Sequence, residues 1–231
     1  ANTLQTISNL KHIVRHGVVV DLIYPKREKS SNGNLAKIQE YYQFDDHLNL
    51  RLEKHPFPFG RIKIFKKFTF IISHFLWAKY IVNKLTKEKY QTQAYITRSE
   101  WIFYFLSKKD KNVTYECHQL SKIKKILVPL SLKKPNSKVI FLNAKLQNKI
   151  LKNNLNVKKT VIIHNGVDED YFKKHIEKNE NEIVFVGNLK RFNKNRNLEF
   201  LINSFKKKHI LDNYKLKLSL IHISEPTRLS R

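Results

Sequence analysis

Two short apolar runs each end in side chains that can do chemistry. The runs have the length and flanking residues of buried strands, and His118 directly follows the second one. Glu116 precedes His118 by two positions and therefore shares one sheet face with it. Arg98 and Ser99 follow the first run. Because open α/β sheets bind ligands beyond the carboxyl ends of their strands, these four residues are candidates for lining a cleft.

Each of these residues also has a structural interpretation. A single histidine at a strand end more often stabilises the fold than reacts. Glu116 is better suited to positioning a loop than to chemistry. Ser99 is equally well placed to cap the N-terminus of the helix that follows it.

The surrounding elements alternate between strands and helices, which predicts an α/β fold of the Rossmann-like kind, a parallel sheet with helices on both faces. The expected helices are 2–15, 99–107, 123–132 and 144–153, and the expected strands are 18–24, 94–97, 113–117, 138–142 and 160–164. Gly17 is predicted to end the first helix in a left-handed turn, and Pro25 to stop the first strand.

Four regions follow from this pattern. We expect a first domain at 1–164, an interdomain linker at 165–181 and the first βαβ unit of a second Rossmann-like domain at 182–218. Its elements are a strand at 182–186, a helix at 197–207 and an apolar run at 216–223. We expect 219–231 to be a non-native tail, because the lysine bias ends there and two of the nine arginines fall in the last four residues.

Within the first domain, residues 26–60 are polar and rich in turn formers. They predict a long excursion or mobile loop.

The formal charge of +26 first suggests a nucleic acid or an anionic membrane as the partner. However, lysine outnumbers arginine 36 to 9, and Asn, Ile, Phe and Tyr are abundant while Gly, Ala and Pro are scarce. AT-rich codons produce this pattern, and the lysines are spread over every segment. Nucleic acid is therefore not expected. The single cysteine, Cys117, cannot form an intrachain disulfide, so a cytoplasmic location is the default.

The basic, aromatic segment 60–85 has two interpretations that one helix can satisfy together. Its apolar side can be core, with lysines toward solvent. It can also dock on an anionic membrane, at the inner face of the cell membrane, with Phe65, Phe68 and Trp77 at the interface. Its purest apolar stretch is too short and too polar to span a bilayer.

Several motifs resemble glycosyltransferase family 4, whose members have the two-domain GT-B fold. The segment VIIHNGVDEDYF at 161–172, followed by IVFVG at 183–187, is similar to the junction between the two domains of that family. YITRS at 95–99 and YECH at 115–118 are similar to two of its strand ends. The resemblance covers roughly residues 1–218.

This resemblance implies a retaining enzyme that transfers a sugar from a nucleotide-sugar to a saccharide or lipid-linked saccharide, in bacterial surface-polysaccharide assembly. His118 would contact the donor sugar or the acceptor as a catalytic residue, with Arg98, Ser99 and Glu116 lining the acceptor side of the cleft. No cofactor and no metal is implied.

The resemblance also places a diphosphate cradle in the second domain. Gly187 would allow close backbone approach to a phosphate. Lys194 falls where the family has a diphosphate-binding lysine. The partner arginine is replaced by Asn188, and Lys190 or Arg191 would substitute for it.

The family's first strand and glycine-rich loop would precede residue 1, and its E-x7-E motif would follow residue 231. We therefore expect a fragment truncated at both ends and inactive by itself. The alternative is a basic Rossmann-like binding domain for nucleic acid or an anionic membrane surface.

Overall fold

The computed structural model describes residues 2–26, 34–42, 44–58, 66–88, 94–152, 156–166, 180–187, 190–191, 194–195, 197–207 and 213–220. The chain forms two compact units, Ala1–Asp168 and Glu169–Arg231. Residues 167–179 of the predicted linker, 60–65 of the basic aromatic segment and 221–231 of the predicted tail lie outside the described residues.

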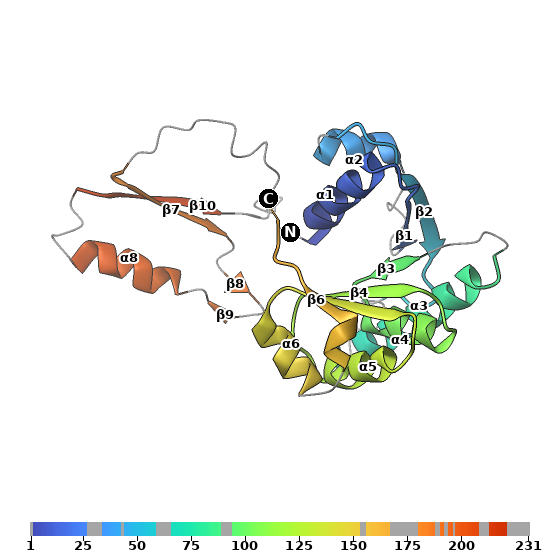
Figure 1. Ribbon diagram of the computed structural model, residues 1–231. Coiled ribbons are helices and arrows are strands. Elements are labelled where there is room, and N and C mark those ends of the chain that lie inside the picture. The colour runs from blue at the N-terminus through green and yellow to red at the C-terminus, as the bar shows by residue number, and fades with distance from the viewer. Residues whose placement is uncertain are drawn as a thin grey trace, which may run out of the picture. The chain divides into compact units, whose positions relative to one another are not determined.

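The first unit alternates helices and strands, as the sequence predicts (Figure 1). In chain order its elements are α1 (Asn2–Arg15), β1 (Asp21–Lys26), α2 (Leu35–Tyr42), β2 (Asn49–Lys54), α3 (Lys66–Leu85), β3 (Tyr95–Thr97), α4 (Glu100–Lys108), β4 (Val113–Cys117), α5 (Lys122–Leu132), β5 (Ser137–Phe141), α6 (Ala144–Leu151), the 3-10 helix η1 (Asn156–Lys159) and β6 (Thr160–Ile162).

The first helix ends as predicted, but the first strand does not. Gly17 adopts φ +78°, the left-handed conformation that ends a helix most cheaply in glycine. The strand starts at Asp21 and continues through Pro25 to Lys26, so the prediction that Pro25 stops it is wrong. Val20 O and Lys26 O both accept hydrogen bonds from β2 or the residue after it. The backbone N–H and C=O groups of the even-numbered residues of β1 therefore point toward β2. The backbone of Pro25 points away from β2, so the N–H that proline lacks would not have joined the β1–β2 ladder.

The prediction of a loop at 26–60 is also wrong, because this stretch contains α2 and β2. Asn34 begins α2 by accepting a hydrogen bond from the Lys37 backbone N–H at 3.2 Å. The strands β1 and β2 then pair in parallel over six residues, from Asp21↔Asn49 to Lys26↔Lys54. The helices α1 and α2 close one face of this pair around a small apolar core. The buried residues of that core are Ile7, Phe44 and Leu48, with Leu10, Val14, Val20, Leu22, Leu35, Ile38, Tyr42 and Leu50 packed against them.

A second, four-stranded sheet has the parallel order β3-β4-β5-β6, and α3 to α6 cover one of its faces (Figure 1). Alternate residues of the central strands point into this helical layer and are fully buried. The core between sheet and helices consists of Trp77, Ile81, Val82, Phe103, Leu106, Val113, Tyr115, Cys117, Val128, Leu132, Val139, Phe141, Leu146, Ile150 and Leu151. This unit is therefore α/β with a helix-flanked parallel sheet, consistent with a Rossmann-like fold.

Helices on both faces were predicted, and the two sheets differ in this respect. The β1–β2 pair has α1 and α2 on one face and residues of α3 on the other. On the face of the four-stranded sheet turned away from α3–α6, Ile96 is 58% exposed and Val161 48% exposed. Helix α1 reaches this face at the carboxyl end of the strands, where Thr6 contacts Arg98.

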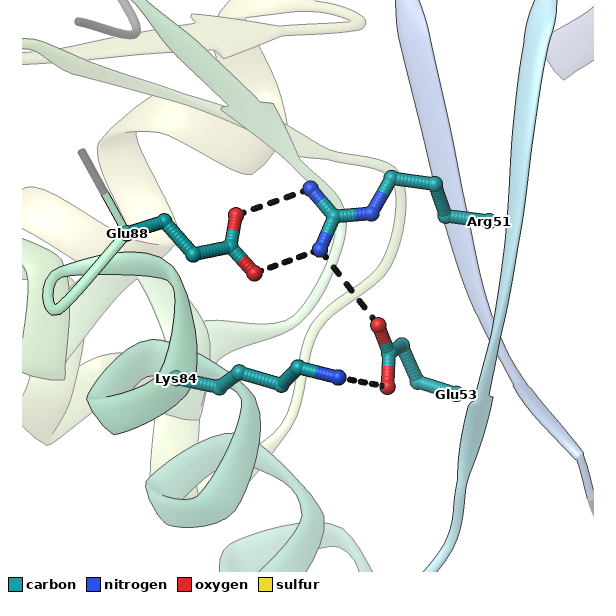
Figure 2. Close-up of polar contacts among 4 residues, drawn as sticks. All are labelled: Arg51, Glu53, Lys84 and Glu88. Atoms are coloured by element: carbon teal, nitrogen blue, oxygen red, sulfur yellow. Dashed lines mark hydrogen bonds and ion pairs between the residues drawn. The ribbon is translucent and has the colours of Figure 1, made fainter. Parts of the chain in front are cut away.

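A network of charged side chains fastens β2 to the end of α3, as Figure 2 shows. Arg51 donates two hydrogen bonds to the Glu88 carboxylate, at 2.9 and 2.5 Å. Glu53 accepts from Lys84 at 2.6 Å and lies 3.4 Å from Arg51. Glu53 is almost fully buried, so the two cations supply the partners that a buried carboxylate requires.

Helix α3 contributes to the core through Trp77, so the predicted membrane-facing role of Trp77 is wrong. Trp77 is 8% exposed and stacks on the buried His55 ring at 5.2 Å between centroids. His55 Nδ1 accepts a hydrogen bond from the Phe57 backbone N–H. Ser73, on the same helix, lies beside His55 and donates to Phe57 O at 2.7 Å. Phe68 is 64% exposed, as that prediction requires, and Phe65 lies outside the described residues.

The second unit contains the predicted strand–helix–strand unit. Its elements are β7 (Glu182–Gly187), β8 (Lys190–Arg191), β9 (Lys194–Asn195), α8 (Leu198–Lys207) and β10 (Lys215–Leu220). The strands β7 and β10 pair in parallel from Glu182↔Lys215 to Gly187↔Leu220. The short antiparallel pair β8–β9 was not predicted. Val184 and Val186 of β7 are more than half exposed, so this pair leaves apolar strand surface uncovered by the described residues.

Candidate functional site at the carboxyl edge of the sheet

Three of the predicted site residues meet at the carboxyl ends of β3 and β4. Arg98 Nε donates to Glu116 Oε2 at 2.6 Å, an ion pair whose side chains are 25% and 17% exposed. The parallel register explains the meeting, because Thr97 pairs with Tyr115 and brings the next residues of both strands to one edge. Arg98, Glu116 and His118 have even numbers, which places all three on the sheet face turned away from α3–α6.

His118 completes the cluster. Its Nε2 lies 3.4 Å from Glu116 Oε2, the same carboxylate oxygen that accepts from Arg98. When the ring carries its proton on Nε2, it donates to Glu116, and Nδ1 is left as an acceptor. Glu116 therefore orients the imidazole, and the imidazole can accept a hydrogen bond from a hydroxyl group or bind a developing positive charge. A carboxylate that fixes a histidine in this way recurs in many active sites.

The helix α1 supplies a further residue that the sequence did not reveal. Arg98 Nη1 donates to Thr6 Oγ1 at 3.0 Å, although 92 residues separate the two. One residue earlier, Gln5 donates to Asn165 Oδ1 at 2.5 Å. Asn165 belongs to the predicted junction motif and follows β6. Four segments of the chain thus form this edge of the sheet. Three of them directly follow the strands β3, β4 and β6, and the fourth is the N-terminal part of α1.

Arg98 and Ser99 hold this edge in place. Arg98 spans from α1 to β4 and therefore acts as a positioning residue. Ser99 caps α4: its side chain accepts from the Ile102 N–H at 3.5 Å, and its own N–H donates to Thr97 Oγ1 at 3.1 Å. The capping interpretation of Ser99 is therefore confirmed, and its cleft-lining role stays a prediction.

The strand β4, which carries Glu116 and ends just before His118, buries Tyr115 and Cys117 on its opposite face. Tyr115 stacks on Phe103 at 5.2 Å between centroids, and burial raises the pKa of its hydroxyl. Burial also raises the pKa of the Cys117 thiol to about 11, although the nearby Lys124 ammonium opposes this. A thiol with such a pKa is protonated at neutral pH and does not act as a nucleophile. Cys117 is therefore a core residue.

The predicted diphosphate residues lie in the second unit. Gly187 is the last residue of β7, and β8 and β9 follow it directly along the chain. Arg191 and Lys194 are register partners in the β8–β9 pair. The register thus pairs the two cationic residues that were predicted separately.

Gly166, in the junction motif, has ample space around it. A Cβ atom built on it meets no heavy atom within 4 Å, and its φ is not in the left-handed region. Local backbone geometry therefore does not require glycine at this position.

No group of three or more potential metal ligands occurs among the residues that the structure describes. Comparison with protein-family models gives no match, and neither curated proteins nor solved structures give a significant match.

Proposed function

We propose that this chain belongs to a nucleotide-sugar-dependent glycosyltransferase of the GT-B kind, with its first unit on the acceptor side. The observation that carries the proposal is the Arg98–Glu116–His118 cluster at the carboxyl edge of a parallel sheet. Open α/β sheets bind ligands at this edge, and the sequence motifs that resemble family 4 supply these three residues.

The chemistry of sugar transfer suits the two groups of residues. The leaving nucleoside diphosphate develops negative charge, which fixed cations and backbone N–H groups stabilise. Arg191 and Lys194, paired across β8–β9 and preceded by Gly187, fit that need. His118, fixed by Glu116, fits a sugar hydroxyl, since its Nδ1 can accept a hydrogen bond when Nε2 donates to Glu116.

A survey of donors tests this proposal. The protein, expressed from its complete reading frame, is incubated with UDP-, GDP- and ADP-sugars and with saccharide or lipid-linked acceptors, and released nucleoside diphosphate is measured. We expect one nucleotide class to be consumed, with the anomeric configuration of the donor retained in the product by NMR. Consumption of none of them, under conditions where the protein is folded, would refute the proposal.

A further inference from the structure

We propose that the outer side of the helices α3, α4 and α5 is a docking surface for an anionic lipid membrane. This inference does not depend on the proposed sugar transfer. It rests on the three helices lying in one layer on the same face of the four-stranded sheet (Figure 1). The apolar side chains that α3, α4 and α5 contribute to the core are buried, and other side chains of the same helices remain exposed.

Apolar side chains remain exposed on this layer. Phe68 and Ile126 are 64% and 61% exposed, and Ile71 and Leu130 are exposed as well. A single exposed apolar side chain is ordinary, but a series of them on neighbouring helices marks an interaction surface.

Aromatic rings connect α3 with α4 in the same layer. Phe75 contacts Trp101 edge-on at 5.1 Å between centroids and Phe105 at 5.6 Å, and all three rings are partly exposed. Partly exposed tryptophan and phenylalanine rings beside solvent-facing lysines are typical of proteins that lie at the membrane–water interface.

The charge of the layer is predominantly positive. The sequences of α3, α4 and α5 hold eight lysines and a single carboxylate, Glu100. Lys79, Lys108, Lys122 and Lys125 are exposed among them. Several carboxylates of the unit lie instead around α2 and β2, namely Asp21, Glu40, Asp45, Asp46 and Glu53. An anionic lipid surface complements this distribution, since each lysine near such a surface contributes favourably to binding.

The combination of charge and aliphatic side chains favours lipid over nucleic acid. Lysines serve both partners, but exposed isoleucine and leucine gain nothing from a phosphate backbone, whereas they are stabilised in the acyl region. No helix among the described residues is long and apolar enough to cross a membrane, so the surface would lie on the bilayer.

Vesicle co-sedimentation tests the proposal with the 231-residue chain. Vesicles of phosphatidylcholine with about 30% phosphatidylglycerol are compared with pure phosphatidylcholine, since only the former carry the negative charge that the lysines require. We expect binding to the anionic vesicles that weakens as salt rises. Lys122→Glu with Lys125→Glu should weaken it at least ~30-fold, from the loss of two lysine contacts. Phe68→Ser with Ile126→Ser should weaken it by about 10-fold or more.

The matched control reverses the charge of two lysines that lie outside α3, α4 and α5. Lys37 and Lys138 are exposed on α2 and on the opposite face of β5, so Lys37→Glu with Lys138→Glu changes the net charge equally. This variant should bind with less than about a 3-fold change, because its charges lie away from the docked surface. Protection of Cys117 from a thiol reagent shows that each variant is folded.

Three results would overturn the proposal. One is equal binding to neutral and anionic vesicles, or to neither. Another is equal weakening by the two charge reversals. The third is a protein that binds no vesicles but binds duplex DNA or RNA in a salt-sensitive way, with the same affinity in the apolar double variant. That result would assign the surface to nucleic acid instead.

Discussion

Removal of Arg51 should destabilise the first unit by a measurable and pH-dependent amount. Its guanidinium makes a two-pronged contact with Glu88, whose side chain is 22% exposed, while Arg51 is 28% exposed. Fully exposed ion pairs contribute about 0–1 kcal/mol, and hydrogen bonds to charged groups contribute about 1.5–3 kcal/mol. The partly buried geometry lies between these limits. We expect Arg51→Met to cost about 2 kcal/mol, Glu88→Gln about 1.5 kcal/mol, and the two to couple by ~1 kcal/mol in a double-mutant cycle.

The coupling should depend on pH with a definite sign. The hydrogen bonds from Arg51 lower the pKa of Glu88, and its charge adds to the effect. A carboxylate whose pKa is lowered in the folded state contributes stability above its unfolded pKa, about 4.3, and loses it as the pH falls through the folded pKa. The coupling should therefore be constant from pH 7 to about 5 and decline below about 4. Glu88→Gln should show none of this decline.

Cys117 provides the assay. It is the only cysteine of the chain and is fully buried in the first unit, so its reaction with a dipyridyl disulfide in increasing urea reports the opening of that unit alone. Lys87→Met is the control, because Lys87 is an exposed residue beside the network and should change stability by less than about 0.5 kcal/mol. A coupling under ~0.3 kcal/mol, or one that acid leaves intact, would refute the reasoning.

Three further predictions concern single residues. In the native state Cys117 should react with iodoacetamide at pH 8 far more slowly than in urea. Because burial raises its pKa to about 11, stability should also fall as pH rises from about 9 towards 11, and Cys117→Val should remove that part of the loss; fast native labelling would contradict the burial. Ser99→Ala should cost about 1 kcal/mol of stability in urea unfolding through loss of the α4 cap, and Ser99→Asp should restore most of it. Gly17→Ala should cost about 1 kcal/mol because φ is +78°, whereas Gly166→Ala should be neutral, and equal costs would show that the left-handed turn is not the cause.

The sequence predicts the elements with strong periodicity and misses those that need distant contacts. The helix 2–15 and the strand 113–117 have the predicted bounds, because apolar spacing and flanking turn residues specify them locally. The segment 26–60 is polar, and its helix is stabilised mainly by packing on α1 and on Leu48. That packing is not visible in local composition, so the segment resembles a loop.

The candidate site shows the same division. The strand-end positions of Arg98, Glu116 and His118 follow from the alternation of elements, and the parallel register brings them together. Thr6 has no distinguishing signal, since its role depends on where the first turns of α1 lie against a strand end about ninety residues later. The aromatic and basic residues around Trp77 leave a core and a membrane-facing interpretation open, and only the structure shows that it lies with Ser73 and Ile81 on the buried stripe of α3.

We propose that His118, oriented by Glu116, takes part in sugar transfer. The most direct test measures nucleoside diphosphate release by the protein from its complete reading frame, with His118→Gln beside Lys138→Gln, an exposed residue on the same sheet face as Glu116. We expect His118→Gln to lower kcat about 100-fold, the usual cost of removing one group that stabilises a transition state, and Lys138→Gln to leave it unchanged. Equal turnover by both variants and the parent protein, or no nucleotide-sugar turnover by the folded parent, would contradict the claim.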